Sequence, residues 1–342
     1  MVLLGDVLEL RHGPMREALE AARPFFEDLG RALDGRELVV VAGNHDHALV
    51  EPWLACRGEQ HAPEPLGLEQ LLEPAAASRA LERIAGWAAP ARVRVAYPGL
   101  WLRPDVYATH GHYLDCHLTV PTLERLSVAA MSRLLGRPTN AFRSVGDYES
   151  VSAPVFAWRD AVARDAPTGA ALNGLATVTA WHALSGNGSR LRHAPVRWLR
   201  GRAIAGVFPL AVATLNRAGM GPLRADVSIG ELRRAGLRAM GEVAARLDLG
   251  DAYVVFGHTH RPGPLPRDQA SEWIGRGGAR LVNAGSWTYA SIFLSGTPGE
   301  SPYWPGTCVL VDHDGPPVIQ QLLLDRSLAQ LAPPRSRQSR SR

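Results

Sequence analysis

Metal-binding side chains follow four apolar segments of this chain. The segments read VLLGD, VVVAGNH, VYATHGH and YVVFGHTH, and in each an apolar run stops at a small residue before the polar ones. Asp, Asn and His are hard to borderline ligands, so their combination favours Mn, Fe, Zn or Ni over an ion bound by thiolates. The pattern therefore predicts a metal site built by Asp6, Asn44, His110, His258 and His260.

Such a set of ligands suits the hydrolysis of phosphoesters. Two divalent ions about 3.5–4 Å apart favour in-line attack on phosphorus, because they activate a water and neutralise charge on the phosphoryl oxygens. A carboxylate can bridge the two ions, and a general acid beside them can protonate the leaving group. This chemistry requires the four strand ends to meet in space.

The apolar segments are predicted to be strands of a layered α/β fold, because they alternate with segments of helical periodicity. In open α/β sheets, ligands bind beyond the carboxyl ends of the strands. Residues two apart on a strand face the same side, so the His-x-His pairs at 110–112 and 258–260 should converge. We expect strands within residues 1–5, 37–43, 93–97, 105–110, 251–260, 279–286, 306–314 and 316–325.

A long helical block, residues 118–250, interrupts the strands and is predicted to be an inserted cap. Ser228 and Glu231 form a capping-box pattern at the start of its last helix. Pro24 is expected to kink the first helix or to start a second one, and the Asp-Gly pair at 314–315 favours a hairpin turn. Helices are expected over residues 14–34, 67–87, 121–135, 151–164, 170–184, 196–217 and 229–247.

Four short motifs, taken together and in order, resemble those of the calcineurin-like metallophosphoesterases. The motifs are G-D-x-x-E at 5–9, G-N-H-D at 43–46, H-G-H at 110–112 and G-H-x-H at 257–260. The resemblance covers roughly residues 1–112 and 251–325. It implies an α/β fold, a two-sheet metallophosphoesterase-like sandwich flanked by helices with an inserted helical cap. The expected parts are a core of residues 1–117 and 251–330, a cap of residues 118–250 and a disordered basic tail of residues 331–342.

The resemblance implies a role for each metal ligand. Asp6 would bridge two ions, and His260 would bind the first of them. Asn44, His110 and His258 would complete the site of the second ion. Two divalent ions are thus expected, with Mn as the first choice and Fe, Zn or Ni as alternatives.

The resemblance also implies roles for residues beside the metals. His45 would protonate the leaving group or bind the phosphate, with Asp46 orienting it, as a general acid requires. Two further residues are expected at the site because they neighbour metal ligands. His112 would contact substrate or metal, and Arg261 would either bind the phosphate or be solvated. Glu9 is interpreted either as a carboxylate behind the metal ligands or as an acidic residue at a helix start.

One motif of that family is missing from this chain. The family opens with D-x-H on its first strand, which supplies an Asp and a His to the first metal, whereas this chain opens with Met1 and Val2. Either the first metal site is lost, or translation starts further upstream than the sequence does. We favour the second explanation, which predicts an in-frame Asp-x-His after an apolar run in the upstream DNA. The first would make the chain a catalytically impaired single-metal or metal-free binding protein.

The predicted function is metal-dependent hydrolysis of a phosphomonoester, a phosphodiester or a nucleotide-type pyrophosphate. The partner would be a phosphorylated small molecule or a lipid-linked substrate. GDVLE and GHTHRP resemble the branch of the family that cleaves the pyrophosphate of a UDP-linked acylated sugar, although GNHD lacks the usual Arg of that branch. An unrelated zinc hydrolase remains an alternative, and its activity would not depend on Asn44.

The composition excludes several other classes of protein. The chain has 342 residues, of which 46% are hydrophobic and 20% charged, enough for a large buried core. It contains no lysine, which excludes a Walker P-loop and a Schiff-base lysine. Four arginines of the tail account for the formal net charge of +4, so the body gives no case for a nucleic-acid-binding face.

Cysteine usage and hydropathy bear on location. Cys56, Cys116 and Cys308 form no C-x-x-C pair, which favours a reducing compartment. The nearest approach to a transmembrane segment, residues 203–216, is short and contains Pro209. We interpret this segment as cap core, with a membrane-facing or lipid-accepting surface as the alternative. A cytoplasmic location is expected.

Overall fold

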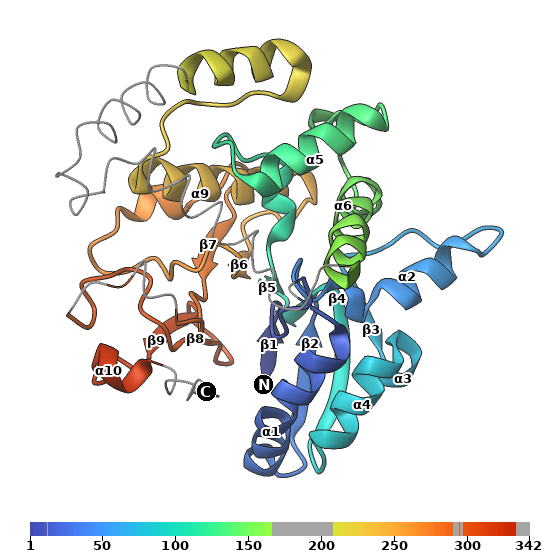
Figure 1. The fold of residues 1–342 in the computed structure, drawn as a ribbon. Helices are drawn as coiled ribbons and strands as arrows, with labels where there is room; N and C mark the ends of the chain where they lie inside the picture. The colour runs from blue at the N-terminus through green and yellow to red at the C-terminus, as the bar shows by residue number, and fades with distance from the viewer. Residues whose placement is uncertain (12, 166–207, 290–293, 295–296, 333–342) are drawn as a thin grey trace, which may run out of the picture.

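The computed structural model describes residues 1–11, 13–165, 208–289, 294 and 297–332, which form a mixed α/β fold (Figure 1). The expected helix at 170–184, the first part of the one at 196–217 and the tail from residue 333 lie outside these described residues. The described strands are β1 (Val2–Leu4), β2 (Glu37–Val41), β3 (Glu69–Leu72), β4 (Arg92–Arg103), β5 (Val106–Thr109), β6 (Tyr253–Phe256), β7 (Arg280–Asn283), β8 (Thr307–Leu310) and β9 (Val318–Gln321). The described helices of the first half are α1 (Met15–Leu33), α2 (Glu51–Gly58), α3 (Pro74–Ala77) and α4 (Arg79–Trp87). Those that follow are α5 (Leu123–Leu134), α6 (Val145–Asp165), α9 (Ile229–Arg246) and α10 (Leu328–Leu331).

Seven of these strands form one mixed sheet in the order β1-β2-β4-β5-β6-β7, with β3 pairing on β4, while β8 and β9 form a separate antiparallel pair. The twelve-residue β4 joins the two halves of the sheet, because its first part is parallel to β2 and its last part antiparallel to β5. The sheet curls, since the ring Nδ1 of His110, after β5, lies 2.9 Å from the carbonyl oxygen of Leu4, at the end of β1. The curl brings strand ends together that β2 and β4 separate in the pairing order.

Three buried clusters explain the layers. Side chains of β2 alternate, so that Leu38 and Val40 pack against α1 and α4, while Val39 and Val41 face the other way. Val39 and Val41 share a cluster with residues of β5, β6 and β7, so the two halves of the sheet have a common core. The outer face of β5 to β7 packs against α5, α6 and α9, which lie above the sheet in Figure 1.

The predicted cap, residues 118–250, contains the helices α5, α6 and α9 and a helical stretch at 208–220. Ser228 caps α9, because its hydroxyl oxygen accepts a hydrogen bond from the backbone N–H of Glu231 at 3.2 Å. The backbone N–H of Ser228 donates to Asp226 Oδ1 at 2.9 Å, so Glu231 does not complete the predicted capping box. No helix in the described residues is long and apolar enough to cross a membrane.

One local prediction was wrong. Residues 67–87 do not form one helix, because residues 69–72 pair with β4 as an antiparallel strand and Pro74 then starts the helical part. Pairing with β4 outweighs the local helical preference there. Of the two outcomes expected for Pro24, a second helix does not form, because α1 continues through this exposed residue. The expected hairpin is present as β8 and β9, although residues 311–317 link the two strands.

Candidate metal centre

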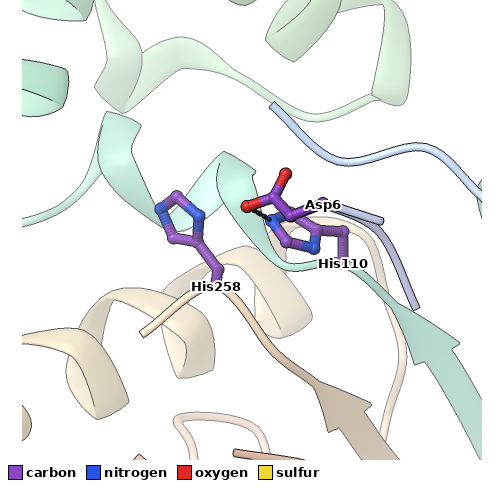
Figure 2. A group of neighbouring side chains, drawn as sticks. All are labelled: Asp6, His110 and His258. Atoms are coloured by element: carbon purple, nitrogen blue, oxygen red, sulfur yellow. Dashed lines mark ion pairs between the residues drawn. The ribbon is translucent and has the colours of Figure 1, made fainter. Parts of the chain in front are cut away.

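The structure brings the ends of β1, β2, β5 and β6 to one rim of the curled sheet. Asp6 follows β1, Asn44 follows β2, His110 follows β5 and His258 follows β6. Figure 2 shows the side chains of Asp6, His110 and His258 turned toward one another. One potential ligand atom from each of these three residues lies within 4.8 Å of the other two, the only such group among the described residues.

Asn44 completes this group, because its Oδ1 sits between the two histidines. The Asn44 Oδ1 is 3.2 Å from His110 Nε2 and 3.1 Å from His258 Nδ1. The Asp6 Oδ2 is 3.2 Å from His110 Nε2. Ligand bonds of about 2.0–2.2 Å place neighbouring ligand atoms roughly 3–3.5 Å apart around one ion. These four atoms therefore have the spacing of a metal-ligand set.

The other nitrogen of each ring has its own partner. The carbonyl oxygen of Leu4 accepts from Nδ1 of His110 at 2.9 Å, which leaves Nε2 facing Asp6. Nε2 of His258 lies 3.0 Å from the carboxylate of Asp115, which leaves Nδ1 facing Asn44. Partners of this kind fix the orientation of metal-binding histidines. Sequence reasoning missed Asp115, which reaches the site because the short helix His112–Cys116 turns the chain back after β5.

A buried carboxylate oxygen also indicates an ion at this place. The Asp6 Oδ2 is buried, and the partner that faces it is His110 Nε2, at 3.2 Å in an ion pair. An unpaired buried carboxylate oxygen is costly unless a cation or a donor satisfies it. The donor set of one carboxylate, one amide and two imidazoles therefore fits a divalent transition metal.

The electrostatics of the group favour a cation. Burial raises the pKa of Asp6, but the charges of His110, His45 and His258 outweigh it and hold this pKa well below its usual value. For His110, burial lowers the pKa, while the charge and hydrogen bond of Asp6 raise it to about 9. Without a metal, a proton on His110 thus takes the place of a cation beside Asp6.

Backbone geometry is unusual at the same residues. Asp6, His258 and His260 have φ angles of 54°, 61° and 61°, in the left-handed region that residues other than glycine rarely adopt. Such strain is typical of functional sites, where the surrounding structure holds it in place. A side chain at Gly43 would collide with the carboxylate of Asp6, so this glycine is needed for the close approach of the two loops.

His45 points toward the group, and Glu9 is the carboxylate that orients it. The His45 Nδ1 lies 2.6 Å from Glu9 Oε2, while its Nε2 lies 3.7 Å from Asp6 Oδ2. Burial raises the pKa of Glu9, but the hydrogen bond and charge of His45, and then Arg11, lower it to about 2. Glu9 is therefore ionised, and it shares the Nδ1 of His45 with the guanidinium of Arg11, whose Nη2 also lies 2.6 Å from that nitrogen. Of the two interpretations of Glu9, the structure favours the carboxylate behind the ligands.

The expectation that Asp46 orients His45 was wrong. The Oδ1 of Asp46 accepts from the backbone N–H groups of Gly43 (2.7 Å) and Asp6 (3.2 Å). Its Oδ2 accepts from those of Val7 (2.8 Å) and Leu8 (3.3 Å). Burial and then the charge of Asp6 raise the pKa of Asp46, against these donors. Asp46 thus ties the loop after β1 to the loop after β2.

Asp46→Asn should therefore lower the stability of the folded protein. An amide has a single acceptor oxygen, so two of the four backbone N–H groups would lose their partner, at a cost of about 2–3 kcal/mol in the free energy of unfolding. Urea unfolding in the presence of a chelator measures this without any metal contribution. Asp34→Asn, at an exposed left-handed position that suits asparagine, is the control and should change little. Equal unfolding midpoints for the two variants would contradict this role.

The remaining predicted residues lie at or near the group without joining it. His260 is close enough for burial and the charges of His258, His45 and His110 to lower its pKa to about 4, against Asp6, but it is not part of the ligand group. Arg261 lines the adjacent cavity, with its guanidinium already paired to Asp268 at 2.5 and 2.9 Å.

The structure does not place His112 at the substrate. Its two ring nitrogens are buried without a hydrogen-bond partner among the described residues, and its ring packs against Tyr113 and Phe156. The expectation assumed an extended backbone from 110 to 112. β5 ends at Thr109, and Gly111 has a φ of 102°, so the alternation of a strand no longer applies there.

A cavity of about 220 Å³ lies between this group and the cap. Asn44, His45, Asp115 and His258 form its side toward the candidate metal centre. The beginning of α5 and the middle of α9 form the opposite side. The strand-end residues therefore border a partly open pocket in which a ligand can be held.

Comparisons of the chain with known protein families, with curated proteins and with solved structures return no match.

Proposed function

We propose that this chain is a metal-dependent phosphoester hydrolase of the calcineurin-like metallophosphoesterase kind. The observation that carries the proposal is the spacing of 3.1–3.2 Å between neighbouring ligand atoms of Asp6, His110, Asn44 and His258. These atoms come from four separate strand ends, each within one of the family-like motifs. The common core of the two sheet halves supports the two-sheet sandwich of that family.

The residues around the group have separate tasks in this proposal. A divalent ion held by Asp6, Asn44, His110 and His258 would supply activation of water and charge neutralisation on the phosphoryl oxygens. His45, oriented by Glu9, donates a proton from Nε2 to the oxygen of the departing alcohol. Asp115 and the carbonyl of Leu4 keep the two metal-binding rings in place.

The number of ions separates this proposal from its alternative. The ligand group of the described residues accounts for one ion, and a second ion would need further ligands beside Asp6 and His260. A single-metal or metal-free binding protein is therefore the second candidate. Asn44 lies between the rings of His110 and His258. This position favours the metallophosphoesterase-like ligand set over an unrelated zinc site, which would not depend on the side-chain amide of Asn44.

Titration calorimetry of the metal-free chain with Mn²⁺ tests the metal centre. Because the pKa of His110 is about 9 without metal, binding at lower pH must displace its proton. We expect the apparent affinity to rise by about tenfold per pH unit between pH 6 and pH 8, with a stoichiometry of one to two ions per chain. Hydrolysis of 4-nitrophenyl phosphate by the Mn²⁺-loaded chain then separates enzyme from binder. Absence of saturable Mn²⁺ binding would refute the metal centre.

A further inference from the structure

The cavity beside the candidate metal centre indicates a class of substrate. We propose that this leaving-group pocket holds the alcohol part of a phosphomonoester, and that this part is a compact, uncharged, mainly aromatic group. The inference rests on the proposed function, because the metal centre would hold the phosphate. Asn44, His45 and His258 line the pocket, so a group bound there is next to the reacting phosphorus.

The walls of the pocket are mostly apolar. Leu114 and Leu118 come from the segment after β5, and Leu237 comes from the cap helix α9. Phe256 and Trp273 add two aromatic rings, and all five side chains are at least 94% buried. Removing an apolar ring from water into such a site is favourable by roughly 25 cal/mol per Å² of buried area. The pocket therefore favours an apolar alcohol over a sugar.

Charged side chains also line the pocket, but each has an opposite charge within reach. Arg261 pairs with Asp268 at 2.5 Å, and the Arg233 guanidinium lies 2.5 Å from Glu272. Glu124, on the other side, pairs with Arg159 at 3.5 Å. A second phosphate or a carboxylate of the substrate would have to compete with these partners for the arginines. This pairing argues against nucleotides, sugar bisphosphates and amino-acid phosphates.

The size of the pocket limits the alcohol further. A cavity of about 150 Å³ accommodates benzene, so 220 Å³ holds one substituted ring or a pair of fused rings. Pockets for larger ligands measure roughly 300–1,000 Å³. The part of the pocket that the described residues line thus fits a single aromatic group better than a nucleoside or the acylated sugar that the sequence motifs allowed.

Gly236 of α9 offers a direct way to fill the pocket. This buried glycine lines it, and a Cβ added there would meet only the methyl group of Thr259, at an ordinary contact distance of 3.4 Å. Leucine at this position also has a higher helix propensity than glycine. Gly236→Leu should therefore fold and occupy the space of the aromatic group. Gly230→Leu makes the same change on the same helix, at a position that does not line the pocket.

The test compares binding of phenylphosphonate and methylphosphonate to the Mn²⁺-loaded full chain by titration calorimetry. We expect the wild-type protein and Gly230→Leu to prefer phenylphosphonate by about tenfold or more. Gly236→Leu should bind methylphosphonate as before and lose most of this preference, with Gly236→Ala in between. Circular dichroism confirms that each variant is folded.

The outcomes separate this inference from the proposed function. Equal binding of the two phosphonates by the wild type, or a preference that Gly236→Leu leaves unchanged, overturns the pocket assignment. Failure of both phosphonates to bind overturns it as well. Selective binding of phenylphosphonate without hydrolysis of phenyl phosphate supports the pocket and refutes only the hydrolase.

Discussion

Asp6→Asn and His258→Ala should each lower the Mn²⁺-dependent kcat/KM for 4-nitrophenyl phosphate by about a thousandfold or more. Asp6 brings the negative charge of the ligand group, and its buried Oδ2 lies 3.2 Å from His110 Nε2. Asparagine keeps the shape of this side chain and removes its charge. His258 offers Nδ1 to the same space, 3.1 Å from Asn44 Oδ1, and alanine leaves a gap in the ligand set.

The loss should appear in metal binding as well as in catalysis. Calorimetric titration of both variants should show a weakened or absent Mn²⁺ site, while their circular dichroism stays that of the wild type. Asp248→Asn is a matched control, because Asp248 also has a left-handed φ, of 56°, at an exposed position. His313→Ala is the exposed counterpart for histidine. Activity that is unchanged in both Asp6→Asn and His258→Ala would refute the hydrolase.

His45→Asn should lower kcat in a way that depends on the leaving group. A general acid contributes about 10²- to 10⁴-fold, and it matters most when the departing alcohol is a poor leaving group. We expect kcat to fall by about a hundredfold or more with phenyl phosphate and by about tenfold with 4-nitrophenyl phosphate. The reason is that nitrophenolate departs without needing a proton. Steady-state kinetics with both esters measure the difference.

Glu9→Gln should reproduce part of this effect, because glutamine keeps a polar group beside Nδ1 of His45 but loses the negative charge at 2.6 Å. A carboxylate behind a reactive histidine typically changes activity by about 10- to 100-fold. His61→Asn, at an exposed position, is the control and should behave as the wild type. Equal losses with both esters in His45→Asn would mean that His45 binds the phosphate instead of donating a proton.

Much of the candidate site can be predicted from local patterns. Strands with apolar residues on both faces form near-continuous runs, so the strands before Asp6, Asn44, His110 and His258 are visible without a structure. A strand that ends in glycine and a polar residue also marks where a ligand can approach. These rules depend on neighbours in the chain, and they identified the four ligand residues that the structure brings together.

Long-range contacts produced the features that such patterns do not contain. Asp115 meets His258 across 143 residues, and Glu9 instead of Asp46 meets His45, because the curl of the sheet determines which loops touch. His112 became buried because a positive φ at Gly111 ended the alternation of the strand. Residues 69–72 became a strand because β4 offered free backbone partners. The sequence of this protein specifies which side chains can bind a metal, whereas packing between distant segments sets their hydrogen-bond partners and the pocket beside them.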